Sequence, residues 1–236
     1  MELTSMAATW LRDLAGMIWP RTCAICGQTL VDGEEMLCLK CLNGIPLTEL
    51  HRSDFNTIHR RLAADVRIER AGAMMKYHRK GAYSGLIRRG KYNGRPELLR
   101  SLASLYASQL LADSFFDGID LILPVPMHRW KKIRRGYNQS EVIAKALSGR
   151  TGIAVGDNLT ARHGHKTQTR RGAFDRHRNV SSVFEVRHPE ELAGLHILLV
   201  DDVITSGATL HACAKTLTDS VSGIRLSILT LAIASD

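Results

Sequence analysis

Residues 197–209, which read ILLVDDVITSGAT, constrain the fold more than any other part of the chain. Four apolar residues in succession are typical of a strand that is buried on both faces of a parallel sheet. The small and hydroxylated residues Thr205, Ser206, Gly207, Ala208 and Thr209 follow. They let the backbone curl with its N–H groups facing inward, and a helix behind them adds partial positive charge. We therefore predict a strand that runs into an anion-binding loop.

Two carboxylates, Asp201 and Asp202, stand directly before this loop. They would repel a phosphate, so their position favours another role on the same ligand. Adjacent carboxylates can accept hydrogen bonds from the neighbouring hydroxyls of a ribose. Taken singly, Thr-Ser-Gly is a turn and Asp-Asp is often a metal site or a cap, but the full order of residues is more specific. It predicts a site for a phosphorylated ribose.

The remaining elements alternate between apolar strands and amphipathic helices. We expect strands at 120–126, 196–202 and 224–233, and helices at 138–150, at 209–220 and from Pro96 onward, with Leu98, Leu99, Leu102, Leu105, Tyr106 and Leu110 on the apolar face of the last. Asn138 is the expected N-cap of its helix, with Glu141 completing a capping box. Residues 67–78 indicate a strand pair or an irregular segment, and 81–95 a basic loop. This order predicts an α/β fold, a mostly parallel sheet with helices on both faces and ligands at the carboxyl ends of its strands.

Four of the five cysteines form two C-x2-C pairs separated by eleven residues: Cys23, Cys26, Cys38 and Cys41. Two such pairs supply four thiolates, which suits a closed, tetrahedral structural zinc site. Disulfides or a redox motif are the alternatives, but no secretion signal is evident and reducing conditions disfavour disulfides. We expect Cys213 to be a small buried hydrophobic residue.

The chain is basic, with a net charge of +9 and a pI of about 9.6. Such an excess favours polyanions: nucleic acid, phosphorylated metabolites or an anionic membrane surface. Residues 1–20 have helical apolar spacing, which indicates a helix that packs on the main domain or docks on a membrane or partner protein. We expect no transmembrane segment, a cytoplasmic location, and two domains at 1–50 (helix and zinc module) and 51–236.

Basic residues gather in two further segments, 124–140 and 165–184, both expected to be loops. Arg134, Arg135, Lys166, Arg170 and Arg171 are the candidate contacts to a pyrophosphate group or to DNA phosphates. Trp130, Tyr137 and Tyr92 could stack the bases of a single strand. An ordinary solvated surface is the alternative.

The segment 197–209 resembles the phosphoribosyl-pyrophosphate (PRPP) motif of type I phosphoribosyltransferases. The strings R-R-G-Y-N-Q (134–139) and K-T-Q…R…R-x-N…F (166–184), with the cysteine module, resemble the ComF family, which includes ComFC and GntX-like proteins. The resemblance implies a phosphoribosyltransferase-like domain in which Asp201 and Asp202 hold the ribose hydroxyls and residues 205–209 the 5′-phosphate. It also implies a role in natural competence, the uptake of DNA for transformation.

Three functions are compatible with this pattern. The first is a protein that binds PRPP, with Mg²⁺, and single-stranded DNA beside the uptake machinery at the inner membrane. The second is an active Mg²⁺-dependent phosphoribosyltransferase, with an unidentified acceptor bound by a hood at 51–117. The third is a zinc-bearing adaptor with a regulatory phosphoribosyl site. No catalytic residue is identified.

Overall fold

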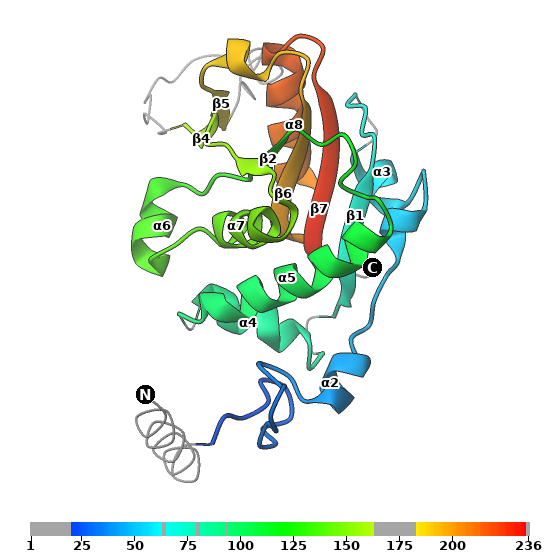
Figure 1. Ribbon diagram of the computed structural model, residues 1–236. Helices are drawn as coiled ribbons and strands as arrows, with labels where there is room; N and C mark the ends of the chain where they lie inside the picture. Colours follow the sequence, from blue (N-terminus) through cyan, green and yellow to red (C-terminus); the bar gives the residue numbers. More distant parts are fainter. Residues whose placement is uncertain (1–19, 63–64, 79–80, 93, 163–182, 235–236) are drawn as a thin grey trace, which may run out of the picture. The chain divides into compact units, whose positions relative to one another are not determined.

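The computed structural model describes residues 20–62, 65–78, 81–92, 94–162 and 183–234 (Figure 1). The chain divides into two compact units, Met1–Pro46 and Leu47–Asp236, which are described separately. The predicted helix at 1–20 falls almost wholly outside the described residues, and the domain boundary expected at residue 50 stays a prediction. None of the described helices has the length and apolar character that a membrane span requires.

The larger unit is built on a five-stranded sheet in which all neighbouring strands are parallel. Its strands lie in the order β1 (Ala71–Tyr77), β7 (Arg225–Ala234), β6 (His196–Ile204), β2 (Leu121–Pro124) and β3 (Ala154–Val155). The β6 strand is central, with Val200 beside Pro124 of β2 and Asp201 beside Thr230 of β7. The predicted parallel α/β sheet is confirmed, and the phosphate loop follows its middle strand.

Helices cover both faces of this sheet, as predicted. On one face, α3 (Thr57–Leu62) and α8 (Ala208–Ser220) pack with alternate residues of β6 such as Ile197 and Leu199. On the other face, α5 (Pro96–Ala112) and α7 (Gln139–Thr151) pack together, and α7 contacts β2 and β6. Side chains along a strand point alternately to its two faces, and helices cover both faces of β6. Both sets of side chains are therefore apolar, which explains the continuous apolar run.

Local signals set the ends of the long helices. Pro96 occupies the first turn of α5, and the predicted apolar face is buried except for Leu105, which is 39% exposed. The Asn138 side chain caps α7 by accepting from Ser140 N at 3.1 Å. The second half of the predicted capping box is wrong, because the Glu141 carboxylate pairs with Lys132 Nζ at 2.7 Å.

Three other expectations are also wrong. Residues 67–78 hold the single strand β1, which pairs in parallel with β7 instead of forming a hairpin. The basic stretch before Pro96 contains the helix α4 (Ser84–Tyr92), and the basic stretch after Pro126 contains the helix α6 (Arg129–Arg135). Arginine and lysine are good helix formers, so these short helices need no apolar stripe to be compatible with their sequence.

The segment 51–117 supplies β1 and α5 to the layers of the main fold, so it is not a separate hood. A two-stranded antiparallel sheet, β4 (Leu159–Ala161) with β5 (Phe184–Val186), adds to the α8 face, where Leu159 and Phe184 are buried. Short 3-10 helices occupy Leu50–Arg52 and Pro189–Leu192. Cys213 is fully buried on α8, as predicted.

Candidate functional site

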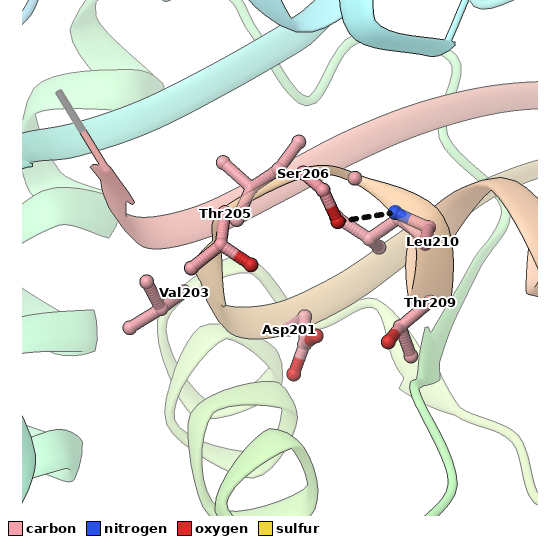
Figure 2. Close-up of a pocket in the computed structure, with 9 residues that line it drawn as sticks. Asp201, Val203, Thr205, Ser206, Thr209 and Leu210 are labelled. Carbon is pink, nitrogen blue, oxygen red and sulfur yellow. Dashed lines mark hydrogen bonds between the residues drawn. The ribbon is translucent and has the colours of Figure 1, made fainter. Parts of the chain in front are cut away.

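The loop between β6 and α8 has the shape that its sequence predicts. The strand ends at Ile204, Gly207 adopts a φ of +84°, and α8 begins at Ala208. Ala208 N donates to Ser206 Oγ at 3.4 Å. Figure 2 shows the small pocket that the loop encloses, about 40 Å³ in volume, with Asp201, Thr205 and Thr209 around it. The predicted phosphate residues and one predicted ribose carboxylate therefore line one cavity.

Arg61 of α3 supports the loop from a segment distant in the sequence. Its guanidinium donates to the carbonyl oxygens of Thr205, at 2.6 Å, and Ala234, at 3.0 Å. A Cβ added to Gly207 would lie 3.3 Å from Leu62 Cδ2, so this glycine also allows α3 to approach. Sequence reasoning missed Arg61, because no local pattern connects it to a loop 144 positions away.

The two carboxylates have different surroundings. Asp201 Oδ1 accepts from Ser140 Oγ at 2.9 Å and from Asp202 N at 2.8 Å. Asp202 Oδ2 lies 2.8 Å from Lys91 Nζ, at the end of α4. Burial, with the adjacent Asp202 charge, raises the pKa of Asp201 to about 7, although Asp202 N, Ser140 and Lys91 act in the opposite direction. Such a carboxyl can exchange a proton near neutral pH. The sequence did not point to Ser140 or Lys91.

A larger pocket, about 510 Å³ in volume, adjoins these carboxylates. Asp201, Asp202 and Thr209 line it together with Arg134 and Arg135 of α6. Two of the predicted basic contacts therefore face the same cavity as the predicted ribose site. Lys166, Arg170 and Arg171 lie outside the described residues.

The helix α6 presents both charge and apolar surface. Trp130 is 74% exposed and Ile133 is 62% exposed. The Arg135 guanidinium lies 4.8 Å from the centre of the Tyr92 ring and donates to Gln139 Oε1 at 2.8 Å. Exposed apolar side chains beside arginines suit stacking on bases as well as contact with phosphates.

The cysteine module forms a compact group in the smaller unit. The Sγ atoms of Cys23, Cys26, Cys38 and Cys41 all lie within 4.8 Å of one another, so the group could hold a metal ion. Gly27, with a φ of +75°, follows the first pair, and its N–H donates to the Cys23 carbonyl at 3.0 Å. The second pair stands at the start of the short helix α2 (Leu39–Asn43), with Cys38 as its N-cap. The sequence therefore predicted the cluster correctly.

Backbone donors lie around one thiol of this group, that of Cys23. Burial opposes ionisation of the Cys23 thiol, but backbone hydrogen bonds at Cys26, Cys38 and Ile25 outweigh it and lower its pKa to about 6. Ile25 N lies 3.5 Å from Cys23 Sγ. The Glu34 carboxylate accepts from Val31 N at 3.0 Å and Leu39 N at 2.7 Å, which joins the two halves of the module. Donors to sulfur stabilise a thiolate, the form that binds metal.

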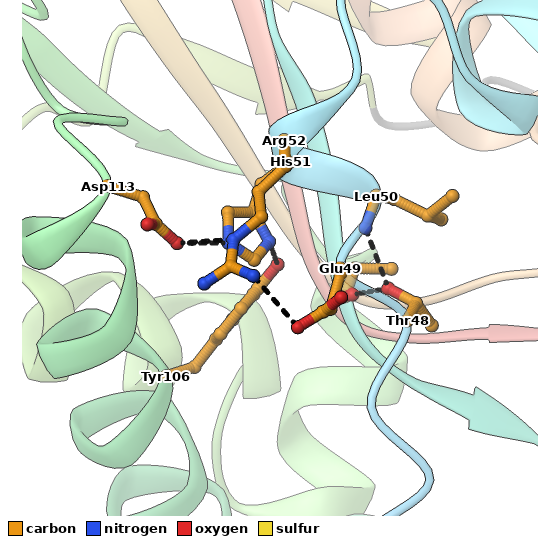
Figure 3. Close-up of polar contacts among 8 residues, drawn as sticks. Thr48, Glu49, Leu50, His51, Arg52, Tyr106 and Asp113 are labelled. Carbon is orange, nitrogen blue, oxygen red and sulfur yellow. Dashed lines mark hydrogen bonds and ion pairs between the residues drawn. The ribbon is translucent and has the colours of Figure 1, made fainter.

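A second polar cluster lies elsewhere in the larger unit (Figure 3). His51 Nε2 is 2.8 Å from Asp113 Oδ2, and Arg52 Nε donates to the same oxygen at 3.1 Å. The other ring nitrogen of His51 lies 3.3 Å from the Tyr106 hydroxyl. Burial raises the pKa of Tyr106 above its usual value, and only 1% of the His51 side chain is exposed. This cluster joins the segment before α3 to the end of α5 and lines neither pocket described above.

Comparison with known proteins agrees with the resemblance seen in the sequence. The chain is 38% identical over 101 residues to competence protein F of Haemophilus influenzae, which covers 42% of this chain and 44% of that protein. It is 32% identical over 127 residues to the DNA utilization protein YhgH of Salmonella typhi, covering 52% and 55%. It is 24% identical over 141 residues to competence protein ComFC of Bacillus subtilis, covering 58% and 54%.

The predicted relationship to ComF-type proteins is confirmed. The chain spans about half the length of the curated relatives that it matches. No protein-family model matches the chain.

Among solved structures, the chain is similar to adenine phosphoribosyltransferase from Saccharomyces cerevisiae, at 18% identity and a TM-score of 0.37, over 63% of this chain and 72% of that one. It is also similar to glutamine PRPP amidotransferase from B. subtilis, at 16% identity and a TM-score of 0.41, over 59% and 30%. The parallel α/β architecture rests on the sheet order and the strand pairing described above.

Proposed function

We propose that this ComF-type protein binds PRPP, or a related phosphoribosyl ligand, between β6 and α8. The observation that carries the proposal is the shared pocket of Asp201 with Thr205, Ser206 and Thr209, at the carboxyl end of the central strand. The loop would hold the 5′-phosphate through its N–H groups and hydroxyls, with Gly207 and Ala208 in its backbone. Asp201 and Asp202 would accept from the ribose hydroxyls, with Mg²⁺ accompanying the ligand.

Calorimetric titration with PRPP and Mg²⁺ tests this proposal. We expect saturable binding at one site, weakened by about 10- to 150-fold in Thr209→Val, since one net hydrogen bond to a charged group contributes roughly 1.5–3 kcal/mol. Ser108→Ala on α5 is the control, because this hydroxyl donates to the Ser104 carbonyl away from the pocket. Absence of PRPP binding to the unaltered protein would refute the assignment.

The second part of the proposal is that α6 binds single-stranded DNA. Arg134 and Arg135 would contact phosphates, and the exposed Trp130 would stack on a base. Lys166, Arg170 and Arg171 belong to the same proposal. The net charge of +9 supports it, because affinity for a polyanion grows with the number of cations that contact it.

Fluorescence anisotropy with a labelled oligothymidylate at several salt concentrations measures this binding. We expect Arg134→Ala/Arg135→Ala to weaken binding and reduce its salt dependence, by about 0.7 in the log–log slope for each phosphate that the variant no longer neutralises. Trp130→Ala should weaken binding by about 1–3 kcal/mol with an unchanged slope. Lys145→Ala, an exposed lysine of α7, is the matched control. Equal binding by all variants would contradict a role for α6.

We place this activity in natural competence and the use of external DNA, by extension from relatives named for competence and DNA utilization. The protein would then act in the cytoplasm, peripheral to the inner membrane, beside the DNA-uptake machinery. Deletion in a competent host, with complementation by the Arg134→Ala/Arg135→Ala variant, tests the assignment. We expect transformation to be lost and not restored by that variant, whereas unchanged transformation after deletion would contradict it.

The metal of the cysteine module is proposed to be structural zinc, because four thiolates are a closed, soft ligand set. Elemental analysis of the purified protein should give one zinc per chain, and Cys41→Ser should reduce that content. A full zinc content in Cys41→Ser would contradict the four-cysteine site.

An active phosphoribosyltransferase is the alternative function. The raised pKa of Asp201 favours it, since a carboxyl with a pKa of about 7 could take a proton from an attacking nucleophile. Release of pyrophosphate from PRPP that depends on an added acceptor, and that Asp201→Asn abolishes even at saturating PRPP, would support this function. If PRPP binds and no acceptor gives turnover, the binding function stands.

A further inference from the structure

Lys91 lies in the larger pocket, but the proposed phosphate and ribose contacts do not include it. Its ammonium group lies 2.8 Å from Asp202 Oδ2, and its side chain is only 22% exposed. It lines the larger pocket with Asp201, Asp202, Arg134 and Arg135. A cation thus stands directly beside the carboxylates in the larger pocket, whereas Thr205 and Ser206 line the smaller one.

Close packing fixes the end of α4 that carries Lys91. A Cβ on Gly90 would lie 2.6 Å from Leu99 Cγ, so only glycine permits the observed approach of α4 to α5. The Gly90 carbonyl oxygen accepts a hydrogen bond from the hydroxyl of Tyr137, which follows the C-terminal end of α6. The residue after Lys91 in the chain is Tyr92, and its ring stacks with the Arg135 guanidinium. Gly90, Lys91 and Tyr92 therefore contact α5, Asp202 and α6 in turn, which fixes the backbone that carries the ammonium group.

The distribution of charge in the pocket indicates what Lys91 would meet. A ligand with its 5′-phosphate on residues 205–209 and its hydroxyls on Asp201 and Asp202 would direct its C1 substituent into the rest of the larger pocket. That space has Lys91, Arg134 and Arg135 in its lining. Asp202 can accept from ribose hydroxyls while it keeps its ion pair with Lys91, and the ammonium group has further N–H donors that can reach an acceptor on the ligand.

We infer that Lys91 is a specificity-determining residue that selects ligands with an anionic group on ribose C1 over those with a hydroxyl there. This inference rests on the proposed phosphoribosyl function and names the class of ligand within it. A simpler role, in which Lys91 only neutralises Asp202, makes a different prediction. A neutralising lysine affects all phosphoribosyl ligands alike, whereas a C1-selective lysine affects only those with charge at C1.

The test compares the Kd values of PRPP and ribose 5-phosphate, measured by calorimetry with Mg²⁺, for the unaltered protein and for Lys91→Met. Methionine keeps most of the length of the side chain and removes the charge. We expect PRPP affinity to fall about tenfold or more, as for the loss of a charged hydrogen bond, while ribose 5-phosphate affinity stays within about threefold. Lys91→Arg, which keeps the charge, should retain most of the preference for PRPP. A thermal transition measured for each variant checks that it folds.

Lys132→Met is the matched control, because Lys132 pairs with Glu141 and does not line the larger pocket. It should leave both affinities unchanged. An equal loss of both ligands in Lys91→Met, or no loss of either, would overturn the inference while leaving the phosphoribosyl site in place. If the unaltered protein binds neither ligand, the proposed function itself fails.

Discussion

Asp113 and Asp201 are two carboxylates of the larger unit with cations nearby, but they are held in opposite ways. Asp113 receives hydrogen bonds from His51 and Arg52, which hold its pKa below the usual value. At Asp201, burial and the adjacent Asp202 raise the pKa to about 7. Lys91 forms its ion pair with Asp202 and not with Asp201.

The difference separates a group that stabilises the fold from one that is suited to a ligand. The ionised form of Asp113 has its partners within the protein. The ionised form of Asp201 accepts from Ser140 and from Asp202 N, but burial and the Asp202 charge outweigh these hydrogen bonds, so ligand hydroxyls would stabilise it further. Ionisable groups in a pocket whose pKa is strongly shifted are characteristic of functional sites. The contrast between Asp113 and Asp201 can be measured by replacing each carboxylate.

The largest expected effect is on the pH dependence of stability. Asp201 has a folded pKa of about 7 against a usual value of 3.8, so its ionisation costs folding free energy as pH rises from about 4 to about 7. A shift of this size corresponds to a cost on the order of 4 kcal/mol above pH 7. Asp201→Asn should therefore raise the free energy of unfolding at pH 8 relative to the unaltered protein, and the gain should shrink toward pH 4. Urea unfolding at both pH values, without added divalent cations, measures it. An equal gain in the free energy of unfolding at both pH values would show that ionisation of Asp201 does not destabilise the folded protein.

The next effect has the opposite sign. Asp113→Asn should lower the free energy of unfolding at pH 7, by less than the change expected for Asp201→Asn, because His51 and Arg52 lose a charged partner. The stabilisation by Asp113 should be present above its usual pKa of 3.8 and disappear as pH falls through the lower folded value. PRPP affinity should not change. Weaker PRPP binding at equal stability would remove the distinction between the two clusters.

The smallest effect concerns the loop backbone. Gly207→Ala places a Cβ at a φ of +84°, which should cost about 1 kcal/mol of stability. The new methyl group would also lie 3.3 Å from Leu62 Cδ2. Thermal unfolding measures the change, with Gly149→Ala, a helical glycine with open space around it, as the control. A Gly207→Ala variant as stable as the unaltered protein would show that the loop readily adopts another conformation.

The central elements of the site were predictable from sequence because their signals are local. The apolar run of β6, the loop residues 205–209, the Asn138 cap and the two cysteine pairs each depend on neighbouring residues. Arg61, Lys91 and Ser140 were not predictable, since each reaches the site through the packing of a distant helix. The helices α4 and α6 were missed for a related reason. They are short and strongly basic, and their packing, as at Gly90 against Leu99, is a tertiary contact.

A calorimetric titration of PRPP into the Asp201→Asn/Asp202→Asn variant tests the central claim most directly, with Asp113→Asn and the unaltered protein in parallel. Loss of two carboxylate acceptors should weaken PRPP binding by about 100-fold or more, since each hydrogen bond to a charged group contributes roughly 1.5–3 kcal/mol. The Asp113→Asn variant should bind PRPP as the unaltered protein does. Binding of equal strength to all three proteins would contradict the assignment of residues 201–209 as a phosphoribosyl site.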